Sequence, residues 1–255
     1  MPGRPLVLSR SDRLLAEHVA AQQGFELVVP AAAGILTVGS SLVPGTISIH
    51  RADASAFLLD VDLPLVAAAL RQEFSTGDDQ FVRAAGEGEL YRIIGRAFQL
   101  CGALPDSPLR TFELETNGLP RTTEAERLVV QRIGQEIFRK ALESYWDRRC
   151  PITGVEDAAL LRASHIIPWA ESTDAERLDV YNGLLLAAHL DAAFDKHLMT
   201  ILPSGAVTFS SRLSGPALAI LNAGNGALQV QLAPGHAPYL ERHRTRFAEL
   251  ESAWM

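Results

Sequence analysis

One stretch decides the fold of the C-terminal half: residues 161–195 read LRASHIIPWAESTDAERLDVYNGLLLAAHLDAAFD. His165 is expected to close an extended segment, because the proline that soon follows disfavours helix in the residues before it. A second strand is expected over 183–187, and a short helix over 190–196. The order is therefore strand, strand, helix, with polar residues at the end of the first strand and on the helix.

Asp191 and Asp195 lie four residues apart on the expected helix. That spacing places both carboxylates on one face, about one turn apart, where like charges repel unless a cation lies between them. Carboxylate oxygens are hard ligands that suit Mg²⁺ or Mn²⁺. The alternative is that one carboxylate bonds to a backbone amide or an arginine. His189 precedes the pair and is either a further ligand or phosphate contact, or an exposed surface residue.

His165 and Asn182 are the other candidate site residues. A neutral imidazole beside a metal-bound phosphate could take a proton from water, because its pKa lies near the working pH. The alternative is a histidine that is hydrogen-bonded inside the sheet. Asn182 precedes Gly183, and Asn-Gly is typical of a tight turn leading into a strand. The functional interpretation is that the Asn182 amide fixes the loop that holds the histidine; both interpretations can hold together.

The composition limits the class of protein. The chain has 255 residues, with 23 Lys and Arg against 30 Asp and Glu and a formal charge of −7, which argues against a nonspecific basic coat for nucleic acid. The two cysteines, Cys101 and Cys150, lie far apart, so neither a disulfide framework nor a paired-cysteine zinc site is expected. We expect no secretory signal and no membrane-spanning segment, and therefore a cytoplasmic location.

Turn-forming residues divide the chain. Residues 1–105 mix short strand-like runs with helical segments and predict an N-terminal α+β domain, with a helix cap at Ser11-Asp12. The stretch 106–121 is rich in Pro, Gly and Asn and is expected to be a linker. Residues 122–255 form the second expected domain, which begins with a capped amphipathic helix to about Trp146.

The segment from about Arg132 to Ser210 resembles an HNH endonuclease module, of the branch found among bacterial restriction endonucleases. The resemblance rests on RIGQEIFRKAL, YWDRRCPITG, LLRASHIIPW, DAERLDVYNGLLL and HLDAAFD, in this order. It implies a ββα-metal fold, in which His165 takes the general-base position and Asn182 the central Asn position. Asp191 takes the metal-ligand position of the final His, and Asp195 that of a second helical ligand.

Two features depart from the family pattern. Ser164 stands where other branches carry a metal-binding His or Asp, and the cysteine pairs that hold structural zinc elsewhere are reduced to Cys150. No structural zinc is therefore expected, and a single divalent ion, Mg²⁺ or Mn²⁺, is the expected cofactor. Arg148, Arg149, Arg162 and Lys196 are candidate phosphate contacts, although residues of this kind are more often solvated surface charges.

The resemblance implies a metal-dependent DNA endonuclease, acting on double-stranded DNA in restriction or defence, with a homodimer as a fair expectation and DNA recognition by the N-terminal domain. His165 would activate water while the ion stabilises the departing 3′ oxygen. Two alternatives stay open. One is a non-catalytic DNA-binding or interaction module on a degenerate HNH fold, and the other is a toxin-type nuclease with an immunity partner.

Overall fold

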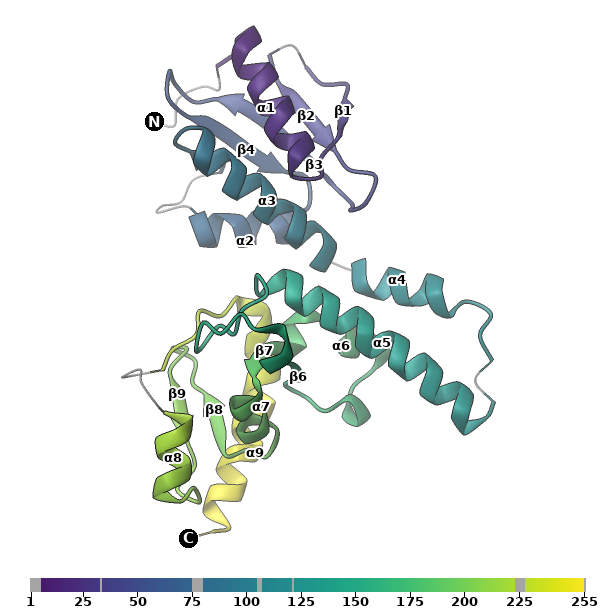
Figure 1. The fold of residues 1–255 in the computed structure, drawn as a ribbon, viewed down its shortest axis with the longest axis vertical. Helices are drawn as coiled ribbons and strands as arrows, with labels where there is room; N and C mark the ends of the chain where they lie inside the picture. The colour runs from purple at the N-terminus through teal and green to yellow at the C-terminus, as the bar shows by residue number, and fades with distance from the viewer. Residues whose placement is uncertain are drawn as a thin grey trace. The chain divides into compact units, whose positions relative to one another are not determined.

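The computed structural model describes residues 6–32, 34–74, 80–104, 107–120, 122–222 and 228–254. The chain divides into two compact units, Met1–Ser107 and Pro108–Met255. Both combine helices with antiparallel strands, which confirms the predicted α+β class (Figure 1). None of the described helices is long and apolar enough to cross a membrane.

Unit 1 is an antiparallel sheet with three helices. Its strands lie in chain order, β1 (Leu27–Val29), β2 (Leu36–Gly39), β3 (Thr46–Arg51), β4 (Phe57–Val61) and β5 (Val82–Ala84). The helices are α1 (Arg10–Gln22), α2 (Pro64–Phe74) and α3 (Glu87–Ala103), and α3 contacts both of the others. Alternate residues such as Ile47 and Ile49 are fully buried, as a sheet with one covered face requires.

Two local predictions differ from the structure, one for the start of α1 and one for the expected linker. The cap of α1 is Ser9, whose side chain forms a reciprocal capping box with Asp12, so the expected cap at Ser11-Asp12 is wrong by two to three residues. Within the expected linker 106–121, the helix α4 (Ser107–Thr116) buries Phe112 in the core of unit 2. The turn-forming residues after Thr116 end this helix instead of extending a linker.

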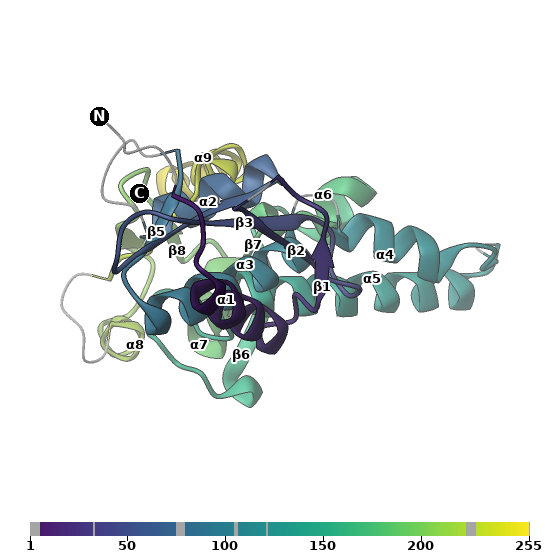
Figure 2. The same cartoon turned by 90° about the horizontal axis from the view of Figure 1, so that it is seen from above.

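Unit 2 begins with two helices and continues into a small sheet. After α4 comes α5 (Glu124–Tyr145), capped by Thr123 and Glu126, and the two run side by side in opposite directions (Figures 1 and 2). Short 3₁₀ and α-helical turns then alternate with strands. These elements are η1 (Ala158–Leu160), β6 (Leu161–His165), η2 (Trp169–Glu171), α6 (Asp174–Leu178), η3 (Val180–Asn182), β7 (Gly183–Ala187) and α7 (Ala188–Asp195).

The strands β6 and β7 pair antiparallel, with His165 opposite Gly183 and Leu161 opposite Ala187. The helix α7 contacts both strands, and α5 also contacts both. Because helices cover both of its faces, β7 is apolar throughout, and Leu184, Leu185 and Leu186 are all fully buried. The observed order of strand, strand and helix is the one predicted from residues 161–195.

The remaining elements pack around this unit. The strands β8 (Met199–Ile201) and β9 (Val207–Phe209) form a hairpin, with Gly205 at positive φ in its turn. The helix α8 (Gly215–Leu221) and the 3₁₀ turn η4 (Pro234–His236) precede the final helix α9 (Ala237–Ser252), which packs on β8.

Candidate active site

Successive residues of β6 reach different neighbours. Adjacent side chains of an extended strand point to opposite faces. The Ser164 hydroxyl faces the carboxylate of Asp191 on α7 and lowers its pKa. The His165 ring lies instead against Phe138 of α5, with ring centroids 3.8 Å apart and planes inclined by 15°. Two neighbouring residues of β6 therefore serve two parts of the candidate site on opposite faces of the strand. Ser164 faces the acidic residues of α7, and His165 faces α5.

The acidic half is formed by α7 and the α7-facing side of β6. Asp191 is half-buried, and burial is the main cause that raises the pKa of its carboxyl; the nearby charge of Asp195 raises that pKa further. Hydrogen bonding from Ser164 and the positive charge of Arg162 act in the opposite direction. The Asp195 carboxylate is exposed and lies 3.1 Å from Nζ of Lys196. Asp191 and Asp195 are therefore close enough on α7 for the charge of one to act on the other.

The donor set fits a hard ion with few protein ligands. Among the described residues there is no group of three or more His, Cys, Asp or Glu side chains that could hold a metal ion. His189, which is exposed in the first turn of α7, therefore does not join Asp191 and Asp195 in such a group. Mg²⁺ is commonly held by one or two carboxylates, with water and substrate phosphate completing its octahedron. Asp191 and Asp195 are the residues that could hold it.

His165 is held in a defined state. Its Nε2 lies 2.9 Å from the carbonyl oxygen of Arg177, and because a carbonyl only accepts, Nε2 carries the proton. Burial lowers the pKa of the ring, an effect that exceeds the opposing hydrogen bond to Arg177. The ring is therefore neutral at neutral pH, with its free lone pair on Nδ1. This atom has no hydrogen bond to a described residue, and it is not one of their buried unpartnered atoms.

Asn182 ties the loop between the two strands to the start of β7. Its side chain is fully buried. Oδ1 accepts from the backbone N–H of Ile167 at 2.9 Å, and Nδ2 donates to the carbonyl of Glu176 at 2.9 Å and to the hydroxyl of Ser172 at 3.4 Å. One amide thus holds the chain just after His165 and just before Arg177, whose carbonyl holds the imidazole.

Glycine at position 183 is required by the packing of α5 and not by the turn that the Asn-Gly pair predicted. Its backbone is extended, with φ −152°, so no left-handed conformation requires it. A Cβ at this position would lie 2.5 Å from Phe138 Cζ and 2.6 Å from Leu142 Cδ1. The glycine therefore makes room for the side chains of α5.

Three residues of the site carried little sequence signal. Phe138 was recognisable only as one apolar residue of an amphipathic helix. Trp169 places its ring edge-on to His165, with centroids 5.5 Å apart. Arg177 contributes a backbone carbonyl, which any residue type could supply. Its side chain donates to the carbonyl of Trp169 and forms an ion pair with Asp174.

The candidate phosphate contacts differ in their present partners. Arg149 forms ion pairs with Asp147 and Glu156, and Lys196 forms one with Asp195. Arg162 donates to the carbonyls of Ala159 and Leu161 and lies near Asp191. Two cations of this set therefore lie beside the acidic half of the site, Arg162 near Asp191 and Lys196 against Asp195.

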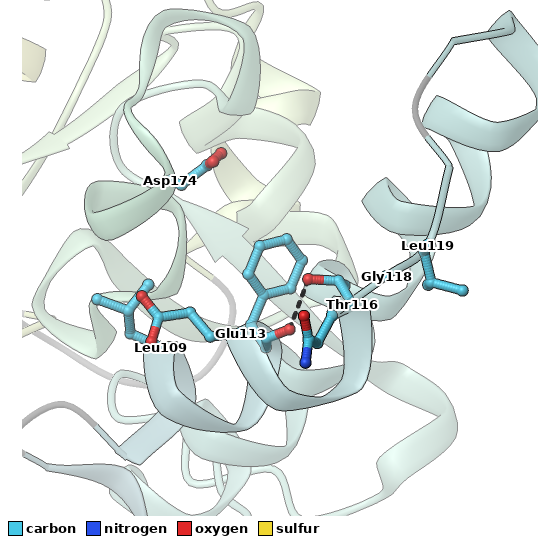
Figure 3. Close-up of a pocket in the computed structure, with 8 residues that line it drawn as sticks. Leu109, Glu113, Thr116, Gly118, Leu119 and Asp174 are labelled. Atoms are coloured by element: carbon cyan, nitrogen blue, oxygen red, sulfur yellow. Dashed lines mark hydrogen bonds between the residues drawn. The ribbon is translucent and has the colours of Figure 1, made fainter.

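A cavity of about 430 Å³ lies elsewhere in unit 2, beside α4 and α6 (Figure 3). Thr116 on its wall donates to the carbonyl of Phe112, and Asp174 lines it from α6. No predicted site residue lines this cavity, whose wall consists of Leu109, Phe112, Glu113, Thr116, Asn117, Gly118, Leu119 and Asp174. It is separate from the candidate active site.

Part of the chain matches a known protein family. Residues 150–202 match the family described as HNH endonuclease. The matched segment contains β6, β7, α7 and the loop that Asn182 organises, and it leaves out α5 and α9. No curated protein matches the chain.

Proposed function

We propose, from the match of residues 150–202 to the HNH endonuclease family, that the protein is a metal-dependent endonuclease that hydrolyses phosphodiester bonds of double-stranded DNA. In the proposed site His165 is the general base, Asn182 fixes its loop, and Asp191 with Asp195 holds Mg²⁺ or Mn²⁺. Bound there, the ion would neutralise charge on the phosphate and on the departing 3′ oxygen. The products would carry 5′ phosphates.

The observation that carries the proposal is the state of His165. A general base must be neutral and must offer a lone pair to water. The bond from Nε2 to the Arg177 carbonyl fixes the proton on one nitrogen, and burial keeps the ring neutral. Nδ1 is then the atom that takes the proton from water.

The separation of His165 from Asp191 agrees with in-line displacement. The attacking water and the leaving oxygen lie on opposite sides of phosphorus, so the base and the metal ligands need not touch each other. Ser164 and His165 are neighbours on β6, and only the former faces α7. A phosphate at the end of β6 would therefore have the imidazole on one side and the carboxylates on the other.

The proposed biological setting is restriction or defence in the cytoplasm. Unit 1 would select the DNA, and a homodimer would supply the second active site that a double-strand cut requires. No metal-holding group of three is present among the described residues, and Ser164 replaces a ligand of other branches. These two observations favour a non-catalytic DNA-binding module as the second candidate.

A plasmid cleavage assay separates the two candidates. Wild-type protein is incubated with modified and unmodified supercoiled plasmid and Mg²⁺ or Mn²⁺, with and without chelator. The proposal expects nicked and linear products that need the ion and are lost in His165→Ala. His18→Ala is the matched control, because His18 lies on α1 and, among the described residues, its ring bonds only to Gln22 of the same helix. DNA binding without cleavage under every metal would support the non-catalytic module and overturn the nuclease.

A further inference from the structure

Phe138, from outside the HNH match, forms the closest ring contact that His165 makes among the described residues. It lies on α5, its side chain is almost fully buried, and its ring stacks nearly parallel on the imidazole at 3.8 Å between centroids. A stacked face restricts rotation of the imidazole about its Cβ–Cγ bond, since tilting the ring would drive it into Phe138.

The stack depends on a gap in β7. Gly183 stands opposite His165 in the strand register, and a Cβ there would lie 2.5 Å from Phe138 Cζ. No real Cβ contact is that short, so the aromatic ring occupies space that only glycine leaves open. The pairing of Gly183 with Phe138 is thus built into both elements.

The remaining sides of the imidazole are also occupied, with one exception. Trp169 meets it edge-on, and the Arg177 carbonyl accepts from Nε2. The positive charge of the Arg177 guanidinium also acts on the imidazole, and it lowers the pKa of His165. Phe138 from α5 adds no charge. One face of the His165 ring, one edge and Nε2 are therefore held by neighbouring residues, and Nδ1 is the nitrogen left for water.

We propose that Phe138 is a positioning residue for His165: its ring fixes the plane of the imidazole so that the Nδ1 lone pair points at the attacking water. This inference rests on the proposed function, because it assigns a purpose to that orientation. Misplacing a reacting group by about 1 Å costs roughly a hundredfold in rate. A residue that serves only the core would affect stability and leave the orientation of the ring unchanged.

The test compares Phe138→Leu with Leu142→Val in the full chain. Both substitutions remove apolar volume from α5, but only the first removes the flat face against His165. Histidine-labelled protein gives the tautomer and titration of His165 by NMR, with His165→Ala identifying the signal. Single-turnover cleavage measured against pH gives the rate and its acid limb.

In Phe138→Leu we expect mixed tautomers of His165, a pKa that rises towards its ordinary value as solvent reaches the ring, and a rate lowered about tenfold to a hundredfold. Since the base acts only when neutral, the acid limb moves to higher pH. Leu142→Val should keep the wild-type tautomer, acid limb and rate. Phe138→Met, which fills the space without a planar face, should behave as Phe138→Leu and serves if the leucine variant does not fold.

Unchanged tautomer and acid limb in both Phe138 variants would overturn the inference, as would equal changes in Leu142→Val. The NMR measurement does not need cleavage. If the wild-type protein does not cut DNA while Phe138→Leu still frees the ring, the proposed function fails and the positioning contact stands. If the wild type cuts and the ring is unaffected, the positioning role fails alone.

Discussion

Replacing Asn182 by aspartate should make the stability of unit 2 depend on pH in a new way. The change keeps the shape of the side chain, and the oxygen that accepts from Ile167 N–H at 2.9 Å is retained. The new oxygen, however, takes the place of Nδ2 and faces the carbonyl of Glu176, which that nitrogen reaches at 2.9 Å. Two acceptors then face each other in a fully buried position.

The cost follows from the ionisation of the introduced carboxyl. A buried charge without a partner costs about 3–5 kcal/mol, so Asn182→Asp should lose roughly that much free energy of unfolding at pH 8. Burial raises the pKa of the introduced group, and once protonated it can donate to Glu176. The Asn182→Asp variant therefore regains stability as pH falls and loses it as pH rises, and at pH 5 its free energy of unfolding is about 1 kcal/mol below that of the wild type.

Urea unfolding at pH 8 and pH 5 measures this, with wild type compared at each pH. Asn182→Ala leaves Ile167 N–H and the Glu176 carbonyl without this partner, and should lose about 2–5 kcal/mol at both pH values. Asn222→Asp, at an exposed position, should stay within about 0.5 kcal/mol. A deficit in Asn182→Asp that is below about 1 kcal/mol at pH 8, or equal at both pH values, would refute the assigned hydrogen bonds.

Two further outcomes follow from buried groups of unit 2. Burial lowers the pKa of His236 to about 4, so between about pH 6.5 and pH 4 the unfolded state binds the extra proton and the free energy of unfolding falls as pH is lowered. His236→Phe should remove up to about 3 kcal/mol of this loss. Equal pH slopes of the two proteins in urea unfolding would contradict this expectation. Gly183→Ala places a methyl group against Phe138 and should cost about 1–3 kcal/mol in the same assay, whereas an unchanged midpoint would show that α5 yields without strain.

The sequence was sufficient to predict the elements around the site because their signals are local. The apolar run Leu184–Leu186 requires a strand that is covered on both faces, and the structure buries all three residues. The helix expected over 190–196 is present as Ala188–Asp195 and carries both Asp191 and Asp195. These predictions needed only residues that are near one another in the chain.

The contacts that define His165 could not be predicted in the same way. Its proton is placed by the backbone carbonyl of Arg177, which leaves no trace in the residue type. Phe138 lies 27 positions earlier in the chain and was one apolar residue among several. Gly183 was interpreted as part of a turn, because the space that it leaves is visible only when α5 is packed against β7. Tertiary packing decided each of these.

The most direct test of the central claim measures Mn²⁺ binding and DNA cleavage on the same preparations of wild type, His165→Ala and Asp191→Ala. The account predicts that His165→Ala binds Mn²⁺ and DNA as the wild type does but cleaves at least about a hundredfold more slowly, while Asp191→Ala loses Mn²⁺ affinity first. Cleavage at the native rate by His165→Ala, or native Mn²⁺ affinity in Asp191→Ala, would contradict the division of the site into a base and a metal-holding half.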